Sequence, residues 1–193
     1  MISERQKRYM RLALERAEEA SRKGDVPVGA VLVRGEKVLA TGGNVRVQRK
    51  NPLGHAELEV LAKAAEKEGS WRFDGAELYV TLEPCIMCCG ALLQCRVGAI
   101  HYGASDPRAG GAGSLYNIPE DSRMPFRCKV YKGILEEECK RLLQDFFLEK
   151  RKKVFYRGDY AEGWPSGRRR ATRNRLGGDE PSRGFKSHPL RQK

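Results

Sequence analysis

Apolar and polar positions along the first 157 residues follow two periods, one typical of helices and the other of strands. Residues 3–23 carry apolar side chains on one face among arginines and glutamates, which predicts an amphipathic helix that ends near Gly24. Residues 26–33 form a nearly continuous apolar run, and residues 37–41 resume a strand after a short turn. This spacing predicts a β-hairpin directly after the first helix.

Strand and helix patterns alternate through the rest of this region. Further strands are predicted over residues 77–82, 97–102 and 126–132, and further helices over residues 55–68, 84–94 and 134–152. Residues 43–54 and 103–125 are rich in loop-forming residues such as Gly, Pro, Asn and Ser. The order of elements indicates an α/β protein, and we expect a three-layer α-β-α sandwich built on a five-stranded mixed sheet.

The periodic pattern stops after residue 157. Gly, Pro, Ser, Arg and Asn dominate residues 158–193, a composition that buries too little apolar surface to fold. We therefore expect a folded domain over residues 1–157 and a disordered basic tail over residues 158–193. Residues 163–167 and 184–190 can be back-translated into sequences that resemble the D-arm and T-arm of a tRNA, in the correct order. We hypothesise that the tail is encoded by an overlapping tRNA gene.

Positive charge is concentrated at the carboxyl end of the chain. The 193 residues have a formal net charge of +12, and residues 148–193 alone carry 14 Lys and Arg against 5 Asp and Glu. Such an excess favours a polyanionic partner such as nucleic acid, although a solvated tail without a target has the same composition. The chain has no apolar run long enough to span a membrane, and the first ten residues lack the apolar stretch of a secretory signal. Six cysteines without an export signal indicate thiols or metal ligands in a cytoplasmic protein.

Two predicted helices begin with groups that bind metals. His55 opens one helix, and Cys85 and Cys88 open another, where the helix dipole favours the thiolate form. Pro84 suits the first helical position because its missing N–H is not needed there. Two thiolates and one imidazole provide three ligands for tetrahedral Zn²⁺ and leave a fourth position for water, as in catalytic sites. A closed structural site with a third cysteine is the alternative, but we expect Cys89 and the other cysteines to pack in the core.

Glu57 lies two residues after His55, and the irregular first turn of a helix can direct both side chains toward one metal. A carboxylate in that position can take a proton from zinc-bound water and deliver it to a leaving group. His-x-Glu followed, after a strand, by Pro-Cys-x-x-Cys is the signature of zinc deaminases.

The chain resembles the cytidine deaminase-like superfamily and, within it, the bacterial tRNA-specific adenosine deaminases. The resemblance spans residues 5–153 and is carried by residues 24–31, 43–44, 81–88, 106–115 and 138–147. It implies that His55, Cys85 and Cys88 bind one Zn²⁺ per subunit and that Glu57 is the catalytic proton shuttle. It further implies hydrolysis of adenosine to inosine at the wobble position of a tRNA anticodon, usually in an arginine tRNA, by a homodimer.

The same resemblance suggests residues that contact the anticodon stem-loop. Asn44 would hold the nucleoside, and Asp106 and Arg108 lie on the loop that resembles the family's substrate-side loop. At the end of the last helix, one of two adjacent aromatics packs in the core, and we expect Phe147 to stack on RNA bases. The neighbouring Lys150 and Arg151 would meet phosphates.

Two other functions remain open from the sequence. A deaminase of a free base or nucleotide, such as guanine or cytosine, would share the zinc motif and would not need a basic last helix. A non-catalytic RNA-binding subunit with structural zinc would have no need of Glu57.

Overall fold

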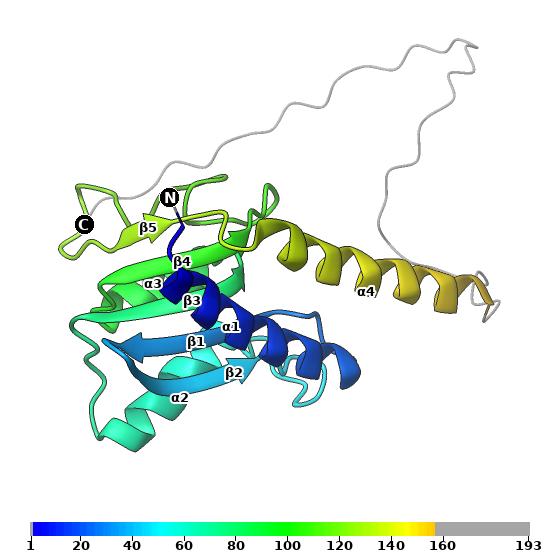
Figure 1. Cartoon of the computed structure of the whole chain (residues 1–193), viewed down its shortest axis with the longest axis horizontal. Helices are drawn as coiled ribbons and strands as arrows, with labels where there is room; N and C mark the ends of the chain where they lie inside the picture. Colours follow the sequence, from blue (N-terminus) through cyan, green and yellow to red (C-terminus); the bar gives the residue numbers. More distant parts are fainter. Residues whose placement is uncertain (1, 157–193) are drawn as a thin grey trace, which may run out of the picture. The chain divides into compact units, whose positions relative to one another are not determined.

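The computed structural model describes residues 2–156, and the predicted tail and its proposed tRNA-gene origin lie outside them. Predicted and observed elements agree in type and order, with ends that differ by a few residues (Figure 1). The helices are α1 (Glu4–Arg22), α2 (Ala56–Glu68), α3 (Ile86–Gln94) and α4 (Glu136–Tyr156). The strands are β1 (Gly29–Arg34), β2 (Lys37–Gly43), β3 (Ala76–Leu82), β4 (Ala99–Ala104) and β5 (Lys129–Tyr131).

The five strands form one mixed sheet in the order β2-β1-β3-β4-β5. β1 runs antiparallel to β2 and to β3, whereas β3, β4 and β5 are parallel to one another. The hairpin and the mixed sheet predicted from the sequence are therefore confirmed. The strand predicted over residues 126–132 is much shorter, because only Lys129–Tyr131 pairs with β4 at the edge of the sheet.

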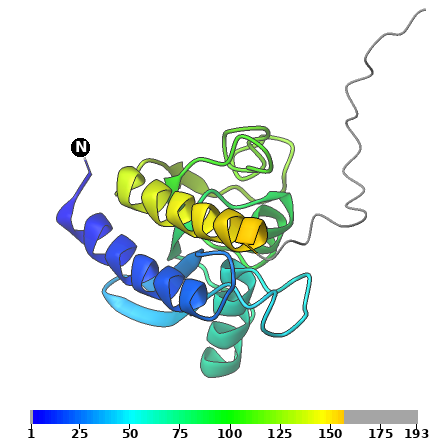
Figure 2. The same ribbon diagram turned by 90° about the vertical axis from the view of Figure 1, so that its right-hand side faces the viewer.

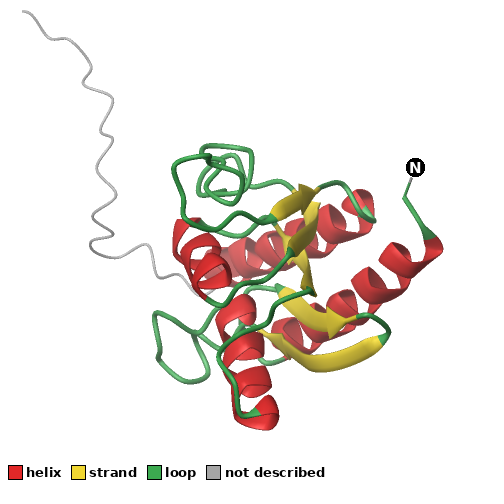
Figure 3. Cartoon of the chain, turned by 90° about the vertical axis from the view of Figure 1, so that its left-hand side faces the viewer, coloured by secondary structure: helices red, strands yellow, loops and turns green. Residues whose placement is uncertain are grey.

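Helices cover both faces of the sheet, which confirms the three-layer sandwich. α1 and α4 pack on one face, where Tyr9, Met10 and Cys139 share a buried cluster with alternate residues of β1 and with Tyr79 of β3. α2 and α3 pack on the other face around a larger cluster that includes Val60 and Leu92. Figure 2 shows α1 and α4 side by side on one face, and Figure 3 shows helices on both sides of the strands. Among residues 2–156, no helix combines the length and apolar character needed to cross a membrane.

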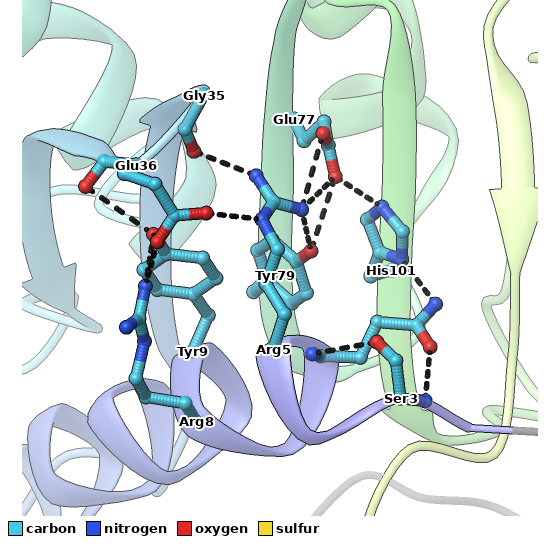
Figure 4. Close-up of polar contacts among 10 residues, drawn as sticks. Ser3, Arg5, Arg8, Tyr9, Gly35, Glu36, Glu77, Tyr79 and His101 are labelled. Atoms are coloured by element: carbon cyan, nitrogen blue, oxygen red, sulfur yellow. Dashed lines mark hydrogen bonds and ion pairs between the residues drawn. The ribbon is translucent and has the colours of Figure 1, made fainter.

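The amino-terminal end of α1 is fixed to the sheet by polar contacts (Figure 4). Ser3 and Gln6 form a capping box that satisfies the first free amides of α1. Nη1 of Arg5 donates to the carboxylate of Glu77 at 3.0 Å and to the hydroxyl of Tyr79 at 3.0 Å. These bonds hold α1 across the first residues of β3.

His101 belongs to this same network. Its ring is stacked between Tyr79 and Tyr131, with ring centroids 4.3 and 4.7 Å away, and its Nε2 lies 2.9 Å from a carboxylate oxygen of Glu77. Burial lowers the pKa of His101 below its ordinary value. This histidine therefore has a packing role on the α1 face, away from the cysteines that open α3.

α1 approaches β1 so closely that only a glycine fits between them. A Cβ added to Gly29 would overlap the backbone of Ala13 and lie 2.5 Å from the amide nitrogen of Ala17. Because Ala13 and Ala17 are small and fully buried, the helix backbone rests almost directly on the strand.

We predict that Gly29→Ala lowers the free energy of unfolding by about 1–3 kcal/mol, because the added methyl group pushes α1 off the sheet. Gly90→Ala is the matched control: Gly90 is helical and a Cβ there meets no atom within 4 Å. The control should stabilise the protein by about 0.5–1 kcal/mol, because alanine loses less conformational entropy than glycine when the chain folds. Chemical denaturation measures both, and equal stability of the two variants would contradict this account of the α1–β1 contact.

Candidate functional site

The candidate site lies where the ends of several strands meet the first turns of α2 and α3. Leu82 and Ala104, the last residues of β3 and β4, are paired neighbours, so the loops that follow them start side by side. The antiparallel β1 and β2 bring Gly29 and Gly43 to the same end of the sheet. The amide of Gly29 donates to the hydroxyl of Thr81 at 3.1 Å, which ties the two halves of the sheet together at this end.

His55, Cys85 and Cys88 come together at this end, as the sequence predicts, and are a group that could hold a metal ion. Nδ1 of His55 lies 3.8 Å from Sγ of Cys85 and 3.5 Å from Sγ of Cys88. Tetrahedral zinc bonds of about 2.3 Å to sulfur and about 2.0 Å to nitrogen would separate these atoms by about 3.5 Å. The donor set and its spacing therefore suit zinc.

The start of α3 differs from the prediction. α3 begins at Ile86, Cys85 is its N-cap in extended conformation, and Pro84 lies outside the helix. Placing Pro84 at the first helical position was therefore wrong. Cys85 still lies beside Cys88, because an N-cap side chain and the third helical residue share one side of the helix end.

The two cysteines of the cluster differ in acidity. A hydrogen bond with Cys88 and, to a smaller extent, one with His55 lower the pKa of Cys85 to about 4. The bond to Cys85 raises the pKa of Cys88, and the bond to Cys85 raises that of His55. The cluster therefore combines one acidic thiol with a neighbouring thiol and an imidazole that hold their protons more strongly.

Glu57 lies in the first turn of α2, close to the cluster. Only 3% of the residue is exposed, and burial raises the pKa of its carboxyl group above the ordinary value. His55 is the N-cap of α2 in extended conformation, so its side chain and that of Glu57 reach the same cavity despite their separation of two residues. A buried carboxyl group with a raised pKa takes up a proton more readily than an exposed one, as a group that transfers protons must.

A cavity of about 800 Å³ joins these residues to the loops and to α4. The predicted site residues that line it are Asn44, His55, Glu57, Cys85, Asp106, Arg108, Phe147 and Arg151. Cys88, the third member of the cluster, is fully buried and does not line the cavity. Lys150 does not line it either, and its Nζ lies 5.3 Å from the centre of the Phe146 ring.

The two adjacent aromatics of α4 are divided as the sequence predicts. Phe146 is 8% exposed and belongs to the core, whereas Phe147 is 38% exposed and faces the cavity. Arg151, one helical turn further on, lines the same cavity. α4 therefore presents an aromatic ring and a cation on the side facing the metal cluster.

Asn44 is buried at the wall of the cavity. Its Oδ1 accepts a hydrogen bond of 2.9 Å from the amide of Ala56, the first residue of α2. This bond ties the loop after β2 to the helix that carries His55 and Glu57.

The sequence pattern did not identify three residues at the site. Arg46 lines the cavity near His55 and opposes the rise in the pKa of that histidine. Asp25, 1% exposed, accepts from the amides of Val47 at 2.7 Å and Gln48 at 3.2 Å and holds the loop after β2.

Glu83, 3% exposed, is the third missed residue and holds the loop after β4. A charged residue at the border of an apolar strand was the available signal for both carboxylates. A buried carboxylate needs donors, which these two find in loop amides.

Three of the other four cysteines pack in the core as expected, whereas Cys95 is only partly buried. Cys89, Cys128 and Cys139 are at most 1% exposed, and burial raises the pKa of each thiol. All six cysteines are free thiols. Within the described residues, His55, Cys85 and Cys88 are the group that places three suitable ligand atoms within 4.8 Å of one another.

Known proteins resemble this chain in sequence and in fold. The profile of the MafB19-like deaminases matches residues 4–151. The tRNA-specific adenosine deaminase of Bacillus subtilis (strain 168) is 44% identical over 145 residues, which cover 75% of this chain and 90% of that protein. A chain solved in a study of A-to-I editing by tRNA:A34 deaminases at the wobble position of transfer RNA has a TM-score of 0.68 and 38% identity, covering 70% of this chain and 99% of that one. A guanine deaminase from Nitrosomonas europaea has the same fold at a TM-score of 0.64 and 21% identity, covering 76% of this chain and 85% of that one.

Proposed function

The chain belongs to the tRNA-specific adenosine deaminase family. We propose that it hydrolyses adenosine to inosine at the wobble position of a tRNA anticodon, and that the substrate is an arginine tRNA. One observation carries the proposal: a single cavity joins the buried Glu57 and the metal-binding cluster to Phe147 and Arg151 of α4. A free base needs only the part of the cavity that contains Glu57 and the metal-binding cluster. An anticodon loop also needs the aromatic and cationic wall, where neighbouring bases can stack and phosphates can be neutralised.

We propose that His55, Cys85 and Cys88 hold one Zn²⁺. Two sulfurs and one imidazole nitrogen at the observed spacing fit tetrahedral zinc with one position left for a non-protein ligand. When bound, zinc would act as a Lewis acid that makes water a nucleophile at neutral pH.

Glu57 is proposed as the proton carrier of the reaction. Hydrolysis adds water to C6 of adenine, breaks the exocyclic C–N bond and releases ammonia. The Glu57 carboxylate would accept a proton from the attacking water and deliver it to the departing amine. Its burial supports this role, because the raised pKa makes the carboxylate a better proton acceptor than an exposed one.

The remaining cavity residues are proposed to hold the RNA. Asn44 would contact the flipped nucleoside, and Asp106 and Arg108 would contact the loop nucleotides beside it. Phe147 would stack on a base, while Arg151 at the cavity and Lys150 beside it would meet phosphates.

We further propose a cytoplasmic homodimer whose folded domain ends at residue 157 and whose residues 158–193 take no part in catalysis. The resemblance to the family supports the dimer, and the exposed apolar side chains of Ile86, Leu115 and Tyr116 offer surface for a second copy. A tRNA substrate and six free thiols fit a cytoplasmic location.

Conversion of adenosine in an anticodon stem-loop tests the function. The zinc-loaded protein should form inosine at the wobble position, and Glu57→Gln should lower kcat about 10²–10⁴-fold because the proton carrier is lost. Nucleoside analysis by mass spectrometry measures the product, and zinc content confirms that the variant keeps its metal. Activity on free guanine or cytosine with none on the stem-loop would overturn the proposal.

Two adjacent buried cysteines test the zinc site. Cys88→Ser should lower the affinity for Zn²⁺ at least about tenfold, because a thiolate ligand is replaced by a hydroxyl group. Cys89→Ser is the matched control, since Cys89 is equally buried but does not belong to the cluster. Cobalt absorption and bound zinc per chain measure the difference, and equal loss in both variants would remove Cys88 from the ligand set.

The basic end of α4 and the tail should contribute differently to RNA binding. Lys150→Ala combined with Arg151→Ala should raise KM for the stem-loop about tenfold and reduce the dependence of binding on salt, because two phosphate contacts are lost. A chain ending at residue 157 should keep KM within about twofold of the full-length value. Collapse of affinity in the shortened chain, with the double variant unaffected, would reverse this assignment. Steady-state kinetics give KM, and binding titrations at several salt concentrations give the affinity and its salt dependence.

A further inference from the structure

We infer that Glu83 is a positioning residue for deamination: its carboxylate fastens the loop of residues 105–114 to the segment that carries the ligand Cys85. That loop contributes Asp106 and Arg108 to the cavity. The inference rests on the proposed function, because the loop matters only if these residues meet the substrate. It adds a residue that acts on the reaction through the loop and not through the reacting atoms.

Both oxygens of Glu83 are fully used by the loop. Oε2 accepts from the amide of Asp106 at 3.0 Å and from the hydroxyl of Ser114. Oε1 accepts from the amides of Ala112 at 3.0 Å and Ser114 at 2.9 Å. A carboxylate has about four acceptor positions, and four donors occupy them. Glu83 therefore binds the beginning and the end of the loop at once and has no free acceptor for substrate.

The residues after Glu83 continue the attachment. The amide of Gly111 donates to the carbonyl oxygen of Pro84 at 2.8 Å, and Cys85 pairs with Gly110 in an isolated antiparallel bridge. The loop thus lies as a short extra strand against the backbone that carries a metal ligand. A shift of the Glu83 carboxylate would move the loop relative to that ligand.

Gly110 leaves the space that this arrangement requires. A Cβ at Gly110 would overlap all three atoms of the Glu83 carboxylate group. The φ angle of Gly110 is not in the left-handed region, so the glycine is needed for close approach and not for an unusual backbone conformation. A side chain at position 110 and the carboxylate of Glu83 therefore exclude each other.

Glu83→Gln tests the inference with little change of shape. The amide group replaces one acceptor oxygen by a donor, which then faces loop donors that have lost their partner. Amide exchange at Asp106, Ala112 and Ser114 should become at least about tenfold faster, and KM for the stem-loop should rise about tenfold, because a hydrogen bond to a charged group is lost. kcat should stay within about threefold, and bound zinc should be unchanged.

Glu120→Gln is the matched control. Glu120 is an exposed carboxylate of the same long connection, and it accepts hydrogen bonds from Asn117 and from the amide of Val130, both outside the loop of residues 105–114. It should leave KM and the exchange of the loop amides unchanged. Unchanged exchange and KM in Glu83→Gln would overturn the inference, as would a loss of zinc or of stability with KM unaltered.

Gly110→Ala provides an independent test of the role of Glu83. In the wild-type background it should raise KM about tenfold, because the added methyl group displaces the carboxylate from the loop amides. In a Glu83→Ala background the same change should alter KM less than about twofold, since no carboxylate is left to collide. Equal effects in both backgrounds would contradict the inference. If the wild-type protein forms no inosine, the proposed function fails, whereas amide exchange still decides whether Glu83 anchors the loop.

Discussion

The site depends on the parallel pairing of β3 with β4. Parallel neighbours end at the same edge of a sheet, so the segment after Leu82 and the loop after Ala104 start as neighbours although 22 residues separate these two positions. The first segment carries Cys85 and Cys88, two of the three side chains that could hold a metal ion, and the second carries Asp106 and Arg108. The antiparallel β1 and β2 bring the loop of Asn44 to this edge, and α4 supplies the facing wall. The strand order of one sheet thus places the loops of the cavity, and α4 closes it from the opposite side.

Two helix starts point at the same place in this arrangement. His55 and Cys85 are the N-caps of α2 and α3, and neither side chain forms the usual capping bond to its own helix. The first amide of α2, that of Ala56, is bound instead by Asn44. The positive ends of two helix dipoles lie at the cluster and favour negative charge there, such as that of the Cys85 thiolate.

The sequence was sufficient for features that depend on local spacing. Alternating periods identified every helix and strand, and the separation of His55 from Cys85 and Cys88 by one strand was enough to predict their cluster. Spacing on α4 also separated Phe146 from Phe147. The first helical residue of α3 was predicted wrongly, because Pro84 is favourable both inside and just before a helix start and only the tertiary structure decides.

Asp25 and Glu83 show why other parts of the site could not be predicted. Their partners are backbone amides 22 to 31 residues away, and any residue except proline offers such an amide. No pattern of side chains therefore marks the pairing in the sequence. The shortness of β5 has a similar origin, because its alternating residues extend beyond the three that find partners on β4.

The bond between Asn44 and the start of α2 has a consequence for what the cavity can recognise. A side-chain amide has one acceptor oxygen and one donor NH₂ group, and here the oxygen already binds the amide of Ala56. Because an amide oxygen has two lone pairs, this bond leaves one acceptor position on Asn44 beside its NH₂ donors. The bond to Ala56 also restricts the rotation of the side chain, so the directions of its remaining donors and acceptor are set before any ligand enters.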